Sequence, residues 1–443
     1  MTDHFLLEKL ERLNERHFMF SELIDEVPSD SSFKFNFSAK DNLCTIDFQT
    51  RAGSRILDGY RPPFDATPVS RLRRAGGLLI GKTNMDEFGF GTFCTNSGYG
   101  VPRNPFDIER SCGGSSGGAA AAACLLEDHL SLGVSTGGSI SCPASFCGVV
   151  GLTPTYGRVS RYGLVDYGNS LDKVGILARS SSMIKNHFPT IAGSDPMDPT
   201  SCAQPTLDLD DTQIDSIAVP REAMENIHPS VRDSFLRALD IMRDQLSIDI
   251  HEVTIPSLRF ALPAYYVLAT SEASTNLARY CGMRFGVRGD DVTQHFNDYF
   301  SSVRSKNFGK EAKRRILLGT YSRMVGFRNR YYLKALSVRQ TTISDYARVL
   351  KEHDVVATPT MPFIAPRFSE IERMKPIEMY RADFLTVPPN LAGLPHISVP
   401  CGYVDSMPTG MQLVSRHWSE GTLLNIANLW EGVFQYRFPG AQQ

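Results

Sequence analysis

The chain has 443 residues, which is enough for one large domain or for two to three ordinary ones. Hydrophobic residues make up 42% and charged residues 21%, as in a soluble globular protein, and the formal net charge is −2. This balance excludes a general attraction to nucleic acid or anionic membrane, and no apolar run approaches the roughly 18–20 residues of a membrane span.

The first residues predict a structural helix rather than a targeting signal. Leu6, Leu10 and Leu13 recur at helical spacing, and we expect a helix over residues 3–27. Acidic side chains are spread through the same stretch, whereas mitochondrial presequences are poor in acid.

Alternating side chains predict the first strand. Residues 33–40 alternate between apolar and polar side chains, and Lys40 falls on the polar side at the end of the run. Helical and strand patterns then alternate through a Gly/Ser-rich region. This order predicts an α/β fold with a catalytic core at about 33–190.

The second half of the chain is predicted to be mainly helical before it returns to the sheet. The strongest helical pattern covers 257–350, a region expected to meet substrate or partner. Within it, 304–339 hold eleven Lys or Arg residues against one acid, Glu311, which is typical of a solvated helical face. Short apolar runs in 351–443 predict strands that rejoin the same sheet, so that residues 1–443 form a single domain.

The cysteines indicate no metal site. There are nine, with no Cys-x-x-Cys pair. Cys142 and Cys147 are the closest two, and no further ligand completes a metal-binding spacing. Buried small side chains in a reducing compartment are the expected state.

The stretch RSCGGSSGGAAAAAC at 110–124 allows three interpretations from its residues. A flexible spacer would continue into polar low-complexity sequence, but an alanine-rich helix follows directly. A phosphate-binding loop would need a lysine after the glycines, and none is present. The match to a G-x-S-x-G nucleophile elbow is only formal, because no buried strand precedes it and no later histidine has a catalytic context.

A second glycine-rich turn, STGGSI, offers a better nucleophile. Ser139 follows two glycines at a strand end, where backbone N–H groups can converge on one point, as an oxyanion hole requires. Without a suitable histidine, the base could be a lysine kept neutral by burial. Lys40 is a candidate, although a lysine at a strand end is more often a solvated surface residue.

Three separated motifs together resemble the amidase signature family: KDN at 40–42, GGSSGG at 113–118 and TGGSISCPASFCGVVGL at 136–152. Later motifs, among them NMDEFGFG, NSLDKVG and NLAGLPHISVPCG, resemble one branch, the glutamine-hydrolysing subunits of tRNA-dependent amidotransferases. The resemblance implies the amidase signature fold, a large mixed β-sheet core surrounded by α-helices in one amidase domain.

The resemblance also implies catalytic roles. Ser139 corresponds to the nucleophile that forms the glutamyl ester, Ser115 to a bridging serine after a cis peptide bond, and Lys40 to the terminal base. Lys40 would take a proton from Ser115, which takes one from Ser139, and the relay would return a proton to the departing ammonia. The oxyanion hole would consist of the backbone N–H groups of Thr136, Gly137 and Gly138.

The glutamine-binding residues follow from the same resemblance. Arg315 matches the arginine that meets the α-carboxylate, a pairing suited to bidentate hydrogen bonds. Asp383 matches the acid that meets the α-ammonium. A pocket tyrosine corresponds to Tyr265 or Tyr266, and the sequence does not choose between them.

The implied assembly is heteromeric. A separate amidotransferase partner, the B subunit, would use ATP and Mg²⁺ to activate Glu-tRNA(Gln), and would receive ammonia from this chain to make Gln-tRNA(Gln) for protein synthesis. A small third subunit, or an organellar replacement for it, would wrap the two. No cofactor or ATP motif is expected in this chain itself.

The chain departs from the family in two places. Where the family commonly has Asp and Arg, this chain has Ser135 and Ser141. We hypothesise that an ion pair was lost from both ends together, because one remaining partner would be a stranded buried charge. The segment between the first helix and Lys40 is also much shorter than usual in bacterial members, which favours an organellar form in the mitochondrial matrix, with a cytoplasmic location as the alternative.

Two other functions compete with the glutaminase. One is a stand-alone amidase acting on another small amide. The other is an inactive scaffold, suggested by the two departures, and the presence of Lys40, Ser115 and Ser139 argues against it.

Overall fold

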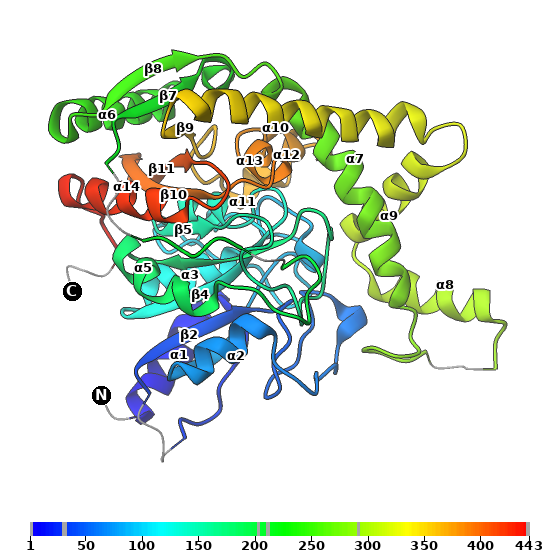
Figure 1. Ribbon diagram of the computed structural model, residues 1–443. Coiled ribbons are helices and arrows are strands. Elements are labelled where there is room, and N and C mark those ends of the chain that lie inside the picture. Colours follow the sequence, from blue (N-terminus) through cyan, green and yellow to red (C-terminus); the bar gives the residue numbers. More distant parts are fainter. Residues whose placement is uncertain (1–2, 29–32, 202–203, 210–212, 290–292, 440–443) are drawn as a thin grey trace.

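An eleven-stranded mixed sheet runs through the molecule, with helices packed around it (Figure 1). The computed structural model describes residues 3–28, 33–201, 204–209, 213–289 and 293–439. In sheet order the strands are β1 (Phe20–Leu23), β3 (Gly77–Thr83), β2 (Phe35–Lys40), β4 (His129–Ser135), β6 (Lys173–Ala178), β5 (Val150–Thr153), β10 (His396–Val404), β11 (Met407–Val414), β9 (Val355–Pro359), β7 (Ser216–Pro220) and β8 (Asp249–Val253). The predicted α/β class and mixed sheet are confirmed, and the C-terminal strands join the same sheet as the N-terminal ones.

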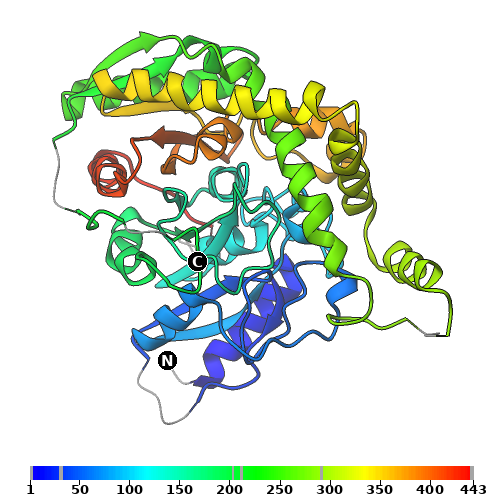
Figure 2. The same ribbon diagram turned by 45° about the vertical axis from the view of Figure 1, so that its right-hand side comes forward.

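The helices surround this sheet. They are α1 (Asp3–His17), α2 (Thr67–Arg74), α3 (Gly117–Leu125), α4 (Ser141–Cys147), α5 (Ser181–Ile191), α6 (Pro229–Leu246), α7 (Leu258–Asn276), α8 (Phe296–Asn307), α9 (Lys310–Arg323), α10 (Lys334–Glu352), α11 (Phe368–Ile371), α12 (Pro376–Arg381), α13 (Val387–Leu391) and α14 (Glu420–Val433). Helices α7, α9 and α10 pack together at one side, and α8 extends outward beyond them (Figures 1 and 2). No helix in the described ranges is both long enough and apolar enough to cross a membrane.

The N-terminal helix is shorter than predicted. It ends at His17 rather than at residue 27, and β1 begins at Phe20. Phe18 adopts a left-handed backbone conformation with φ 51°, which ends the helix. The Asn14 side chain then accepts the Phe20 N–H at 2.7 Å, and this bond turns the chain into the edge strand. Local periodicity continues past His17, but the turn and the pairing of β1 with β3 interrupt it.

Strand β2 is covered on both faces where it approaches its end. Its last four residues are buried, including Lys40, which the alternation had assigned to a polar face. The strand lies between β3 and β4, and α3 packs against all three. The residues of α3 from Gly117 to Cys124 are buried and small, so the helix approaches the sheet closely.

The sheet order places the ends of β2 and β4 side by side. The two strands are parallel, with Ala39 opposite Leu132. Lys40 ends β2, and the glycine-rich turn follows β4 directly after Ser135. Carboxyl ends of parallel strands are common positions for ligand sites, because the chain leaves the sheet there in loops. The KDN motif at 40–42 and the glycine-rich turn at 136–139 therefore meet at the carboxyl ends of these two strands.

Candidate active site

A buried amine and a buried hydroxyl form the centre of the site. The Lys40 Nζ lies 2.7 Å from the Ser115 Oγ and donates to the Val134 carbonyl at 3.0 Å. Both Lys40 and Ser115 are 1% exposed. Burial lowers the pKa of Lys40 to about 7, against the raising effect of the Asp86 and Asp172 carboxylates. At neutral pH a substantial fraction of this amine is therefore uncharged and able to accept a proton.

Ser115 is held by a turn that admits only small residues. The Gly114–Ser115 peptide bond is cis, as expected from the family resemblance, and Gly113 has a positive φ of 76°. A Cβ at Gly114 would collide with the Asp86 carboxylate, and one at Gly117 would press on Cys94. The glycines of this motif therefore serve close packing rather than flexibility.

Ser139 lies beside this turn and is joined to it through the backbone. Its carbonyl accepts the Ser116 N–H at 3.2 Å, and the residue is 8% exposed. Within the described part of the chain, the hydroxyls of Ser115 and Ser139 are not hydrogen-bonded to each other. The structure thus pairs Lys40 with Ser115 directly and brings Ser139 to the same turn.

The predicted oxyanion turn is tightly enclosed. A Cβ on Gly137 would meet the Tyr265 ring at 2.6 Å, and one on Gly138 would collide with Thr386. The Thr136 hydroxyl donates to a carboxylate oxygen of Asp172 at 2.7 Å. Backbone N–H groups held in so rigid a turn are suited to stabilise a developing oxyanion.

Asp172 is a site residue that the sequence reasoning did not assign. Besides Thr136, its carboxylate accepts the N–H groups of Tyr167 at 2.8 Å and Gly168 at 3.0 Å. Burial raises the pKa of Asp172 to about 7. The available signal was the acid of the NSLDKVG motif just before the apolar run VGILA at 174–178, because an acid that is buried with such a strand must find donors.

The predicted substrate residues come together on a second wall. Arg315 is 3% exposed, and its guanidinium carbon lies 5.2 Å from the centre of the Tyr266 ring. Asp383 accepts hydrogen bonds from the Tyr266 hydroxyl at 3.1 Å and from Thr92 at 2.8 Å. Burial raises the pKa of Asp383 to about 6. A cation and an acid linked through one tyrosine match the two charged groups of an α-amino acid.

The two candidate tyrosines occupy different parts of the site. Tyr265 packs against Gly137 in the oxyanion turn. Tyr266 contacts Asp383 and stacks on Tyr380, with ring centres 4.4 Å apart. Both rings therefore border the site, Tyr265 at its reacting end and Tyr266 at its charged end.

Glu311 holds Arg315 in place, a role the sequence reasoning did not give it. Its carboxylate accepts the Arg315 Nε–H at 2.8 Å and the Tyr380 hydroxyl at 2.6 Å, and also pairs with Arg314. Tyr167 accepts a further guanidinium hydrogen bond at 2.5 Å. The one acid of the basic run, four residues before Arg315 on a helix, was the available signal.

An open cavity of about 810 Å³ adjoins these residues. Its wall includes Thr92, Glu311, Arg315 and Tyr380, whereas Ser139 is not part of it. Arg315 therefore borders this cavity, whereas Asp383, Tyr266 and Ser115 are not among the residues that line it. Within the described residues no group of three or more His, Cys, Asp or Glu side chains could hold a metal ion.

The two departures from the family pattern are both buried. The Ser135 hydroxyl donates to the Asn390 side chain at 3.4 Å, and the Ser141 hydroxyl has no hydrogen-bond partner among the described residues. Lys173 is the cross-strand neighbour of Ser135. Its amine donates to the Leu394 carbonyl at 2.8 Å, and burial lowers its pKa.

Comparison with known proteins agrees with this geometry. The sequence matches the amidase family over residues 36–424. It is 46% identical to the A subunit of the glutamyl-tRNA(Gln) amidotransferase of Methanospirillum hungatei, covering 89% of this chain and 91% of that protein. It is 44% identical to the corresponding protein of Geobacillus thermodenitrificans, over 91% and 84%. The crystal structure of the Thermotoga maritima A subunit superposes with a TM-score of 0.83 at 34% identity, over 99% of this chain and 92% of that one.

Proposed function

This chain belongs to the amidase family, among the A subunits of glutamyl-tRNA(Gln) amidotransferases, and we propose that it hydrolyses glutamine through Lys40, Ser115 and Ser139 and passes the ammonia to a partner protein. The observation that carries the proposal is the buried contact between the Lys40 amine and the Ser115 hydroxyl. A lysine near its ordinary pKa is protonated at neutral pH and cannot act as a base, whereas this one has a pKa of about 7.

The relay begins when the Ser139 Oγ attacks the side-chain amide carbon of glutamine. The Ser139 proton passes to Ser115, and the Ser115 proton passes to neutral Lys40. The turn at 136–138 receives the oxyanion on its backbone N–H groups, and losing one such donor typically costs about 3 kcal/mol of transition-state stabilisation. When the C–N bond breaks, Lys40 returns the proton through the Ser115 hydroxyl to the leaving nitrogen, which departs as ammonia, and Ser139 keeps the glutamyl group as an ester. Water then hydrolyses the glutamyl ester on Ser139.

Glutamine is oriented by its two charged groups. Arg315 receives the α-carboxylate and Asp383 the α-ammonium. Tyr266 lies between these two positions, with its hydroxyl on Asp383 and its ring against the Arg315 guanidinium. The Ser115 and Ser139 hydroxyls must come into hydrogen-bonding contact when the substrate binds, because catalytic hydrogen bonds often tighten only in the substrate complex.

The wider assembly is part of the proposal. The B subunit of the amidotransferase would bind ATP, Mg²⁺ and Glu-tRNA(Gln), and a small third subunit, or an organellar replacement, would join the two. The mitochondrial location inferred from the short segment between the first helix and Lys40 stays a prediction.

Glutamine hydrolysis by the purified chain, with and without the B subunit and Glu-tRNA(Gln), tests the proposal. We expect wild type to release glutamate and ammonia, and Ser139→Ala to abolish this release. Ser141→Ala is a matched control, because it removes a buried hydroxyl, unpartnered among the described residues, two positions away. Equal rates for wild type and Ser139→Ala in every mixture would refute the proposal, and hydrolysis of unrelated amides without any partner would favour the stand-alone amidase.

A further inference from the structure

Asp86 is a buried carboxylate that the relay described above does not use. It lies in the loop after β3 and is 0% exposed. Its Oδ1 accepts the Asn96 N–H at 2.9 Å, and its Oδ2 accepts the Cys94 N–H at 3.0 Å. Gly91 and Gly114 face the same carboxylate, and a Cβ on either would collide with it. The surrounding chain is therefore built closely around this one acid.

The Asp86 environment includes the turn that carries Ser115. The Asp86 N–H donates to the Ser115 carbonyl at 3.4 Å, and the Gly114 N–H donates to the Thr92 carbonyl at 2.7 Å. Thr92 in turn donates its hydroxyl hydrogen bond to Asp383. One carboxylate thus organises the loop that touches both the bridging serine and the charged end of the site.

Several titratable groups influence Lys40 and Asp86. The charges of Asp86, Asp172 and the Cys94 thiol act on Lys40, and Lys40 and Arg315 are the cations that act on Asp86. Asp172 is committed to the oxyanion turn through Thr136. Burial raises the pKa of Asp86 to about 7, while its two N–H donors and Lys40 favour its ionised form.

We infer that Asp86 is a positioning residue that holds the Lys40–Ser115 pair and supplies the negative charge that stabilises Lys40 once it has accepted a proton. Lys40 becomes an ammonium in a buried site when Ser115 gives up its proton, and an isolated ammonium is costly there. A nearby carboxylate offsets that cost in the transition state. The inference rests on the proposed function, because it gives Asp86 a role only if Lys40 is the base.

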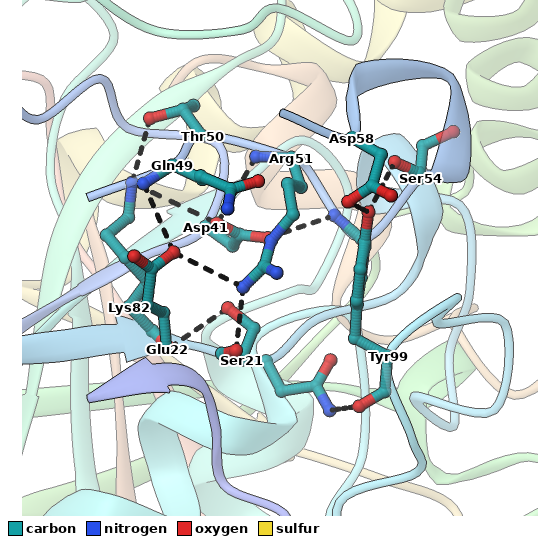
Figure 3. A network of polar contacts seen from close by, with 12 residues as sticks. Ser21, Glu22, Asp41, Gln49, Thr50, Arg51, Ser54, Asp58, Lys82 and Tyr99 are labelled. Atoms are coloured by element: carbon teal, nitrogen blue, oxygen red, sulfur yellow. Dashed lines mark hydrogen bonds and ion pairs between the residues drawn. The ribbon is translucent and has the colours of Figure 1, made fainter. Parts of the chain in front are cut away.

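The chain contains a matched control for this acid. Asp41 is equally buried, and it also accepts two backbone N–H groups, from Arg51 at 3.3 Å and Gly53 at 3.4 Å. Its counter-charges are Arg51 and Lys82, each 4.0 Å away, in the polar network that Figure 3 shows. Asp41→Asn and Asp86→Asn therefore remove the same charge from similar settings. Asp41 follows Lys40 directly in the chain, but its carboxylate interacts with Lys82 and Arg51, whereas the Asp86 carboxylate interacts with Lys40.

The experiment is the pH dependence of kcat for glutamine hydrolysis at saturating glutamine, with thermal unfolding measured in parallel. The fall of kcat toward low pH, here called the acid limb, gives the pKa of the essential base in the enzyme–substrate complex. For Asp86→Asn we expect this limb to move to lower pH by about one unit, since an opposite charge close to a base typically shifts its pKa by one unit or more. The plateau of kcat should fall by up to about tenfold, because the rate follows the strength of the base and Lys40 becomes about one pKa unit weaker. For Asp41→Asn we expect lower thermal stability with the limb at its wild-type position.

The outcomes separate the inference from the proposed function. An unmoved limb in Asp86→Asn would overturn the inference, whereas wild-type hydrolysis that does not require Ser139 would overturn the proposed function itself. If Asp86→Asn does not fold, Asp86→Ser keeps a small acceptor and is expected to show the same limb shift. Failure of both variants to fold, with Asp41→Asn folded, would make Asp86 a structural residue and refute its role at Lys40.

Discussion

The Lys40 amine and the Ser115 hydroxyl are hydrogen-bonded at 2.7 Å in a site that excludes water from both. Lys40 comes from the end of β2 and Ser115 from the loop before α3, 75 positions later. The same burial that permits this contact keeps the amine from being fully charged at neutral pH. The activity proposed for this chain depends on that coupling.

Replacing two of the buried lysines, Lys40 and Lys82, should affect activity in one case and stability in the other. Lys40→Met should reduce glutamine hydrolysis by at least about 10²–10⁴-fold, the usual contribution of a general base, with thermal stability retained because an apolar chain suits the site. Lys82→Met should instead destabilise the fold by about 3 kcal/mol, because the buried Asp41 carboxylate loses one of its two counter-charges and keeps only Arg51. Steady-state kinetics and urea unfolding of both variants test this, and similar kinetics in the two would contradict the assignment of Lys40.

The pH dependence of stability should also identify Lys40. Its pKa is about 7 in the folded chain, against 10.5 for an unperturbed lysine. Between these values the unfolded chain binds the additional proton, so the contribution of Lys40 to stability rises with pH. We expect the unfolding free energy of wild type minus that of Lys40→Met to rise by up to about 1.4 kcal/mol per pH unit in this window. Urea unfolding at both ends of the window measures it, and a constant difference would refute a depressed pKa.

Glutamine affinity should weaken in acid because of Asp383. Burial raises the pKa of this carboxyl to about 6, and the protonated form cannot pair with an α-ammonium. We expect KM for glutamine to rise below about pH 6, by roughly tenfold per pH unit. Asp383→Asn should show a high KM with no such rise. A KM for wild type that is flat through this range would exclude Asp383 from ammonium binding.

Neighbouring arginines provide a test of carboxylate recognition. Arg315 is buried in the site, whereas the Arg314 side chain is 42% exposed, and both pair with Glu311. Arg315→Gln should raise KM for glutamine by about 100-fold, the loss expected for charged hydrogen bonds. Arg314→Gln should change KM little, since a partly exposed ion pair contributes at most about 1 kcal/mol. Equal effects of the two substitutions on KM would contradict a specific role for Arg315, because they would show that glutamine responds only to the overall positive charge of the helix.

A double-mutant cycle tests whether an ion pair was lost at Ser135 and Ser141. Both positions are buried, so a single charge introduced at either one should destabilise the chain. Ser135→Asp and Ser141→Arg together should recover stability, with a coupling energy between about 0.5 and 3 kcal/mol. Because Lys173 is the cross-strand neighbour of Ser135, a stable Ser135→Asp single variant would indicate that Lys173 is the partner instead.

Most elements of the fold could be predicted from local pattern. The strand ending at Lys40 and the helices of 257–350 follow from side-chain periodicity, which reflects short-range geometry. The end of the first helix could not, because the Asn14 bond to Phe20 and the pairing of β1 with β3 override a pattern that continues past His17.

The family motifs predicted the catalytic and substrate-binding residues, because those residue types recur at characteristic spacings. These residues are Lys40, Ser115, Ser139, Arg315 and Asp383. The supporting acids Glu311, Asp172 and Asp86 were not found in this way. Asp172 and Asp86 accept hydrogen bonds from groups that folding brings to them, and a carboxylate in a sequence does not show its eventual donors. Glu311 differs, because it binds Arg315 four positions further along the same helix, a spacing that the sequence does show.

The sequence therefore determines which residue types are present and in what order, including one lysine and two serines in the family motifs. It does not determine the protonation state of Lys40. A charged amine is stable wherever water reaches it, and Lys40 loses that water only because β3, β4 and α3 enclose the end of β2. Whether the residue is a solvated surface cation or a base is decided by this enclosure, which depends on contacts between segments far apart in the sequence.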